Sequence, residues 1–195
     1  MIFIRLWVFF AGVLATVFLG WVALVGVPGV QLGRVPAQPG LPPYTFQQAH
    51  GREIYMREGC VYCHTQQTRP AGFGGDQKRM WGRPSVPGDY VYDRPHLLGT
   101  SRTGPDLLSI GARQPSREWH LSHLYNPRMV VPQSVMPRFP WLFEEKASTD
   151  PLDVVVPVPG ASRAVVATRE ALDLYEYLLG MNRTYPVRRP EAAKP

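Results

Sequence analysis

The hydrophobic residues of this 195-residue chain are concentrated near its amino terminus. The stretch from Leu6 to Val27 contains no charged residue and consists mainly of Leu, Val, Phe, Ala and Gly. As a helix it would extend for roughly 33 Å, which is enough to cross a bilayer. Trp7 and Trp21 lie towards its two ends, where indole rings favour the headgroup level, and Pro28 and Gly29 follow it. The pattern therefore predicts a transmembrane helix that ends at Pro28.

A cleaved signal peptide is the main alternative for this stretch. Signal peptides have an apolar region of about 7–15 residues followed by a cleavage site between small residues. The apolar stretch here is longer, and no convincing cleavage site follows it. We therefore expect residues 1–29 to form an amino-terminal anchor, followed by a linker over residues 30–44.

The rest of the chain shows helical patterns separated by long connections. Thr45 and Gln48 fit a capping box that opens a helix, and Gly59 can end it. A short helix is expected from Arg117 to Tyr125, and a longer one from Arg169 to Leu179. These patterns predict a mainly α fold.

Small residues and prolines refine this picture. Gly51 would let the first and last predicted helices cross closely, with Tyr55 packing against Tyr175 or Tyr177. The stretch from Val154 to Pro159 is expected to be an extended segment or a loop interrupted by proline. The chain also contains 21 Pro and 18 Gly residues, which indicate long irregular connections.

The length of the chain allows one compact domain plus a short appendage. We expect this domain to occupy residues 45–182, with a tail over residues 183–195. The formal net charge of +6 would suit acidic partners, but the basic residues are spread among prolines and acids. The charge therefore predicts a solvated or subunit-facing surface and no nucleic-acid partner.

The two cysteines of the chain, Cys60 and Cys63, are followed directly by His64. This is the C-x-x-C-H arrangement of c-type haem attachment. Its spacing lets both thiols reach the vinyl groups of one porphyrin, and the adjacent histidine becomes an iron ligand. The sequence therefore predicts one covalently bound haem c.

Other uses of these cysteines are less consistent with the pattern. A zinc site would need four ligands, and the remaining histidines show no zinc-finger spacing to Cys60 and Cys63. A redox-active C-x-x-C pair is expected in a βαβ setting, which the sequence does not predict. A buried structural pair of cysteines would not require His64.

An iron held by His64 needs a second axial ligand or stays open to small molecules. Met136 is the leading candidate, because Pro137 can hold the backbone extended and fix the approach of the thioether. His120 and His123 lie three residues apart on a predicted helix, and we expect them to have a surface or packing role.

The segment from Arg102 to Leu107 is also expected to touch the porphyrin. Pro105 could pack on the ring of His64, and its carbonyl or that of a neighbour could accept the free imidazole N–H. Arg102 could pair with a haem propionate. A generic Gly-Pro turn is the alternative for this segment.

Several stretches, in this order along the chain, resemble the mono-haem subunit (subunit II) of cbb3-type cytochrome c oxidases. The resemblance runs from about Thr45 to Leu142. It rests on the segments Gly51 to Cys60, Cys63-His64 with Gln66 and Arg69-Pro70, Gly88 to Asp93, Arg102 to Leu107, Trp119-His120, Asn126 to Arg128 with Val131-Pro132, and Met136-Pro137 through Leu142. The segments 65–68 and 71–84 and the tail after Asp150 differ from the family pattern.

The resemblance implies a class I cytochrome c-like helical domain with long Pro/Gly-rich loops, anchored by one amino-terminal helix. It implies His64 and Met136 as axial ligands, and a catalytic haem-copper subunit as the main partner. A further c-type cytochrome subunit or a soluble cytochrome would donate the electrons, and membrane lipid would surround the anchor. Because haem is attached outside the cytoplasm, we expect a bacterial inner-membrane protein with a cytoplasmic amino terminus and a periplasmic haem domain.

The sequence offers no nucleophile, paired acid or phosphate loop for bond-making chemistry. We therefore expect an electron-relay subunit of an oxidoreductase complex that is not itself the catalyst. Two alternatives remain: the cytochrome subunit of a nitric oxide reductase, and a haem-based gas-binding module.

Overall fold

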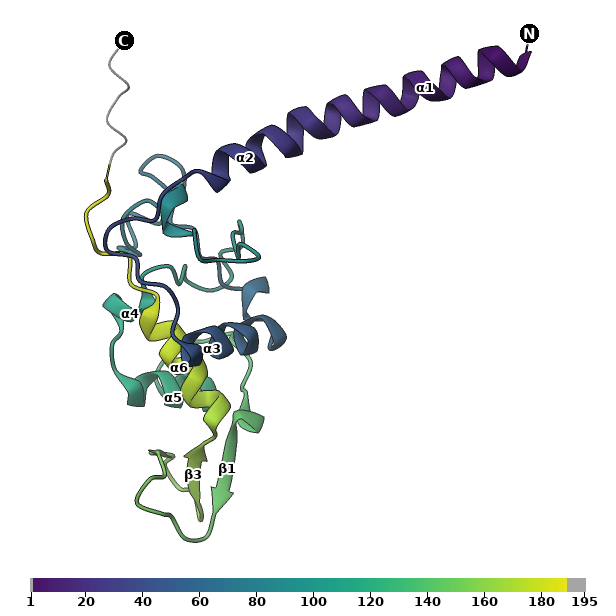
Figure 1. Ribbon diagram of the computed structural model, residues 1–195. Helices are drawn as coiled ribbons and strands as arrows, with labels where there is room; N and C mark the ends of the chain where they lie inside the picture. The colour runs from purple at the N-terminus through teal and green to yellow at the C-terminus, as the bar shows by residue number, and fades with distance from the viewer. Residues whose placement is uncertain (1, 189–195) are drawn as a thin grey trace.

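The computed structural model describes residues 2–188, with side chains from residue 5 onward; the end of the predicted tail, residues 189–195, lies outside them. Its first elements are α1 (Ile2–Trp21), a π-helical turn (Val22–Gly26) and α2 (Val27–Gly33), which form one continuous rod. The rod projects away from the folded part of the chain (Figure 1). Over Arg5–Gly33 it is long and apolar enough to cross a membrane. The expected apolar helix is therefore present, and the folded part does not cover its side chains.

The rod continues past Pro28 and Gly29, where the sequence pattern predicts its end. A proline inside a regular α-helix removes one N–H group and collides with the carbonyl of the preceding turn. Here a wider π-helical turn precedes Pro28, and Val27 N donates to Val22 O within it. Pro28 thus stands in the first turn of α2, where a missing N–H group is tolerated. The predicted end is therefore wrong, and the helix ends at Gly33.

The helix α3 (Phe46–Arg57) begins and ends as predicted. Thr45 Oγ1 accepts a hydrogen bond from Gln48 N at 3.2 Å, and Gln48 Oε1 accepts one from Thr45 N at 3.0 Å. Both bonds of the predicted capping box are therefore made. The helix stops before Gly59, whose φ of 74° lies in the left-handed region that glycine adopts without strain.

The helices α3 and α6 (Arg169–Gly180) cross one another (Figure 1). Gly51 lies where they touch. A β-carbon at Gly51 would lie 2.0 Å from the carbonyl oxygen of Asp173, so the two backbones approach too closely for any side chain. The rings of Tyr55 and Tyr177 meet edge to face at 5.6 Å beside this crossing. The predicted crossing is confirmed, with Tyr177 as the partner of Tyr55.

Two shorter helices, α4 (Ile110–Arg113) and α5 (Arg117–Tyr125), contact α6. The range of α5 is the predicted one, and Ser116 Oγ accepts a hydrogen bond from Trp119 N at 3.2 Å as its cap. The connections also contain 3₁₀ turns at Cys60–Tyr62, Pro87–Asp89, Pro127–Met129 and Pro140–Leu142. The fold is thus mainly helical, as predicted, while the closer likeness to a class I cytochrome c domain stays a prediction.

A small antiparallel sheet lies at the end of the molecule farthest from α1 (Figure 1). Its strands are β1 (Phe143–Lys146), β2 (Val155–Val156) and β3 (Ala164–Ala167), in the spatial order β1-β3-β2. The strand β2 falls in the segment predicted to be extended or a loop. The strands β1 and β3 are not predicted by the sequence pattern, because each has four residues and pairs with a distant segment.

The linker between α2 and α3 lies against the folded domain along part of its length. Gln38 N donates to Gly88 O at 3.1 Å, and Gln38 Oε1 accepts from Arg188 N at 2.8 Å. A β-carbon at Gly40 would lie 2.5 Å from the side chain of Tyr185. The linker is therefore held by segments from the middle and from the end of the chain.

Candidate functional site

The C-x-x-C-H sequence lies in the turn that directly follows α3. The backbone N–H groups of Cys63 and His64 both donate to Cys60 O, at 3.2 and 2.9 Å. These bonds fix the backbone that carries the two thiols and the imidazole. Both thiols are free, and burial raises the pKa of the Cys60 thiol to about 12, so this thiol is protonated at neutral pH.

The imidazole of His64 is oriented by the segment predicted to touch it. Its Nδ1 lies 2.8 Å from Pro105 O; because a carbonyl only accepts hydrogen bonds, Nδ1 carries the proton. Burial lowers the pKa of His64, and the hydrogen bond to Pro105 opposes this shift. The ring is therefore neutral at pH 7, and the lone pair of Nε2 is available to a metal ion.

Gly104 makes this arrangement possible. A β-carbon at this position would lie 2.3 Å from Cε1 of His64, so any side chain would displace the ring. Gly104 N also donates to Cys63 O at 3.0 Å, which holds the two segments together. The sequence pattern points to Pro105 as a contact of His64 but gives no role to Gly104, which lies in the same motif.

Met136 is partly buried and packs against the hydrophobic core, as Cys60 also does. Its backbone N–H donates to Ser134 Oγ at 3.2 Å, which fixes the segment before Pro137. Two other methionines are in less suitable places, since Met181 is fully buried in the core and Met80 is 80% exposed. These positions agree with the ranking of Met136 as the leading thioether.

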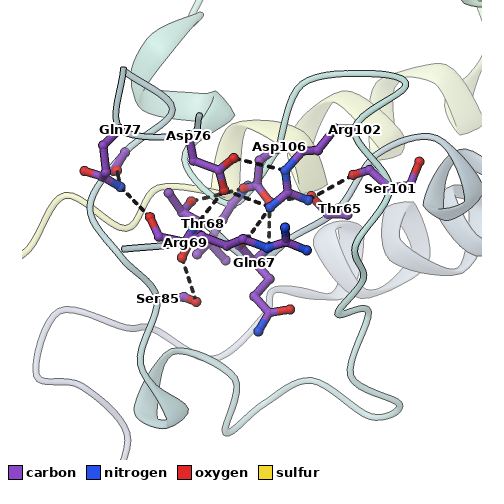
Figure 2. A network of polar contacts seen from close by, with 12 residues as sticks. Thr65, Gln67, Thr68, Arg69, Asp76, Gln77, Ser85, Ser101, Arg102 and Asp106 are labelled. Carbon is purple, nitrogen blue, oxygen red and sulfur yellow. Dashed lines mark hydrogen bonds and ion pairs between the residues drawn. The ribbon is translucent and has the colours of Figure 1, made fainter. Parts of the chain in front are cut away.

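Arg102 lies in a polar network that Figure 2 shows from close by. Its five N–H groups are all engaged as donors, two of them with the carboxylate of Asp76 at 3.0 and 2.8 Å. The other acceptors are Thr65 Oγ1, Ser101 O and Gln67 O. With every donor in use, the predicted contact between Arg102 and a propionate has no support from this geometry and stays a prediction.

Asp106 is at the centre of the same network, although the sequence pattern assigns it no individual role. This carboxylate is fully buried and accepts four hydrogen bonds. Their donors are Thr65 Oγ1 at 2.6 Å, Gln67 N at 2.7 Å, Thr68 Oγ1 at 3.1 Å and Leu108 N at 2.9 Å. Its position directly after Pro105 is the only sequence feature that could have drawn attention to it.

The two histidines of α5 differ in burial, since His123 is only partly buried. His120 is buried, and its Nε2 lies 2.8 Å from Gln114 O. His123 stacks on Trp119, with ring centroids 4.6 Å apart. Burial lowers the pKa of both side chains. The expected packing role is confirmed for His120 by its burial and its backbone partner.

The side chains at this site fit a covalently bound haem better than a zinc ion. Two free thiols stand beside a neutral imidazole, and a thioether on the same core is a usual haem ligand but not a zinc ligand. Over residues 2–188, no three His, Cys, Asp or Glu side chains gather to hold a metal ion.

A family model matches most of the chain. No curated protein matches the sequence. The model of a family described as "Cytochrome C oxidase, mono-heme subunit/FixO" matches residues 4–159, which include the anchor, the C-x-x-C-H turn, the Pro105 segment and Met136. This description implies one haem, and it does not favour the nitric oxide reductase alternative. The chain therefore belongs to the family of mono-haem subunits of cytochrome c oxidase.

Proposed function

We propose that this chain is the electron-transfer subunit of a cbb3-type haem-copper oxidase. It carries one haem c, joined to Cys60 and Cys63 by addition of each S–H group across a vinyl group. His64 Nε2 and the sulfur of Met136 are the iron ligands. When bound, the haem takes up and releases one electron at a time. The observation that carries the proposal is the hydrogen bond from His64 Nδ1 to Pro105 O beside two free thiols.

The protein side chains set the properties of this centre. The carbonyl of Pro105 polarises the His64 ring and fixes its orientation, as outer groups do for metal-bound histidines. A thioether from Met136 raises the reduction potential relative to a second imidazole, which suits delivery of electrons to an oxidant. The chain itself makes and breaks no bonds in the oxidase reaction.

The anchor gives the site its place in the complex. The apolar rod spans the bacterial inner membrane with its amino terminus in the cytoplasm, and the haem domain lies on the periplasmic side. Electrons arrive from another c-type cytochrome, either a subunit or a soluble protein, and leave to the catalytic haem-copper subunit. Anchoring converts a diffusional encounter into a local one with a high effective concentration.

A pyridine haemochrome spectrum combined with mass analysis of the peptide from Tyr55 to Arg69 tests the attachment. We expect one haem per chain, with the peptide heavier by one haem because addition across the vinyl groups loses no atoms. Cys60→Ala should leave a single thioether bond and a shifted haemochrome band. A peptide of unmodified mass from the native membrane protein would exclude the proposal.

Two further measurements separate the alternatives. The purified complex should consume oxygen, whereas a nitric oxide reductase would consume nitric oxide. Carbon monoxide should bind the reduced chain slowly or not at all, because Met136 occupies the remaining position on the iron. Rapid binding would favour the gas-binding module and remove Met136 as a ligand.

A further inference from the structure

The loop between Arg69 and Ser85 has no role in the proposed function so far. It is closed on itself, because Ser85 N donates to Thr68 O at 2.9 Å and Gln77 Nε2 donates to Arg69 O at 2.8 Å (Figure 2). Within the loop, Asp76 is only 2% exposed. The loop therefore holds one carboxylate at a fixed position inside the protein.

This carboxylate faces Arg102. The two side chains form a bidentate ion pair, and Arg69 N also donates to Asp76 Oδ2 at 2.9 Å. The pKa of Asp76 lies below its ordinary value because Arg102 donates hydrogen bonds to the ionised form. The guanidinium of Arg102 lies 5.9 Å from the ring centroid of buried Trp81, so the same loop also covers it from a second side.

Arg102, held by the ion pair with Asp76, also contacts the segment that follows His64. Arg102 Nη1 donates to Thr65 Oγ1 at 2.6 Å, and this hydroxyl donates in turn to Asp106 Oδ2 at 2.6 Å. Thr65 Oγ1 is thus the atom that joins the loop ion pair to the buried carboxylate. Thr65 is the next residue after His64, and Asp106 is the next residue after Pro105.

This series of contacts therefore reaches the segments that carry both His64 Nδ1 and Pro105 O, the two atoms of the imidazole hydrogen bond. Leu107 N donates to Thr65 O at 2.8 Å, and Gly104 N donates to Cys63 O, so the two backbones are paired on either side of that bond. Asp106 ties the same two backbones together by accepting a hydrogen bond from Gln67 N. A shift in either segment would change the distance between His64 Nδ1 and Pro105 O.

We propose that Asp76, Arg102 and Thr65 are positioning residues that hold the Pro105 carbonyl against His64 Nδ1, so that the 69–85 loop tunes the haem. The inference rests on the proposed function, in which His64 binds the iron. A strong bond to the carbonyl makes the imidazole a better electron donor and stabilises the oxidised iron. Loosening the network should therefore raise the reduction potential.

Neutral substitutions separate this geometric effect from a change of charge. Thr65→Val keeps the shape of the side chain but removes the bridging hydroxyl, and Thr65→Ser keeps the hydroxyl. The double variant Asp76→Asn with Arg102→Gln removes the ion pair without changing the net charge. Each is made in the full-length, haem-loaded chain, and haem content is confirmed first by the pyridine haemochrome.

The readouts are the solvent exchange rate of the His64 Nδ1 proton, by NMR of the reduced protein with ¹⁵N-labelled histidine, and the reduction potential. In Thr65→Val and in the double variant we expect exchange to be about tenfold faster and the potential to be higher. Thr65→Ser should keep both the exchange rate and the reduction potential at their native values. If the double variant does not fold, the Thr65 pair alone decides.

A second ion pair provides the matched control. Arg83 and Asp89 are also bidentate, at 2.9 and 2.6 Å, with side chains 18% and 0% exposed against 17% and 2% for Arg102 and Asp76. They contact neither side of the imidazole hydrogen bond, so Arg83→Gln with Asp89→Asn should leave both readouts unchanged. Equal shifts in this control, or no shift in Thr65→Val with haem bound, would overturn the inference. Absence of haem from the native chain would instead overturn the proposed function.

Discussion

At the scale of single residues, the environment of His64 decides what the site can bind. Burial disfavours the charged imidazolium, and the hydrogen bond to Pro105 O selects the tautomer with the proton on Nδ1. A neutral ring of fixed orientation is what an iron ligand requires. In the proposed function the second iron ligand tunes the reduction potential, so Met136 is the most informative position to change.

Replacement of Met136 by histidine should keep the covalent haem and lower the reduction potential. Imidazole stabilises oxidised iron more than a thioether does, and axial ligands tune haem potentials over a range of about 0.8 V. Redox titration of the full-length protein measures the shift, and loss of the sulfur-to-iron absorption band reports the exchange of ligand. Met80→His is the control, because Met80 is 80% exposed. If both variants keep the native potential and band, Met136 is not a ligand.

His120 should make the protein less stable in mild acid. Burial lowers its pKa, so the folded state keeps the ring neutral while the unfolded state takes up a proton below about pH 6.5. The contribution to stability is therefore present at neutral pH and is lost as the pH falls, by up to about 1.4 kcal/mol per pH unit. Denaturant unfolding at pH 7 and pH 5.5 should show a smaller pH effect in His120→Gln than in the native chain. An identical pH effect would show that His120 does not titrate differently in the two states.

At the scale of elements, the crossing of α3 and α6 sets the position of the C-x-x-C-H turn. Two residues separate the end of α3 at Arg57 from the start of the turn at Cys60, so the direction of α3 determines where the thiols lie. That direction depends on the close approach at Gly51 and on the contact between Tyr55 and Tyr177. A change at the crossing should therefore reach the site.

Gly51→Ala should destabilise the fold by about 1–3 kcal/mol, because the added methyl group meets the backbone oxygen of Asp173 at 2.0 Å and the helices must separate. Thermal unfolding of the full-length protein measures the loss. Gly29→Ala is the control, since no atom lies within 4 Å of a β-carbon there. Equal stability of the two variants would mean that the crossing can relax at no cost.

Elements with local determinants are predictable from this sequence, and those with distant determinants are not. The first residues of α3 and α5 follow from the caps made by Thr45, Gln48 and Ser116. Each of these side chains bonds to backbone within three residues of itself. The ion pair of Arg102 with Asp76 spans 26 residues and has no local pattern. The sheet similarly depends on the pairing of β1 with β3, and only the described contacts reveal it. The C-x-x-C-H turn was predictable because its chemistry is carried by adjacent residues.

At the scale of the whole molecule, the apolar rod and the small sheet lie at opposite ends, and the candidate site follows α3 between them (Figure 1). The rod contributes no side chains to the described core, whose buried hydrophobic residues begin at Leu41. Membrane attachment and the folded domain are therefore separate parts of the structure.

A variant in which a cleavable signal peptide replaces residues 2–33 should be exported, leave the membrane fraction and keep its haem, because haem is attached outside the cytoplasm. The removed segment is the long apolar helix, and the contacts of the site all lie between Thr45 and Met181. Fractionation of cells that express both forms, followed by absorption spectra, checks the two expectations. Recovery of the shortened chain with membranes would point to a second means of attachment, such as a partner subunit.

The contacts that hold the linker between α2 and α3 also bear on the proposed electron transfer. A flexible tether of the same twelve residues would have a root-mean-square span of roughly 20 Å and would allow the domain to sweep between distant neighbours. With Gln38 and Gly40 held by Gly88, Arg188 and Tyr185, only a few residues after Gly33 remain free to bend. Under the proposed function, the domain would stay close to one position relative to the anchor, and a soluble electron donor would have to diffuse to it.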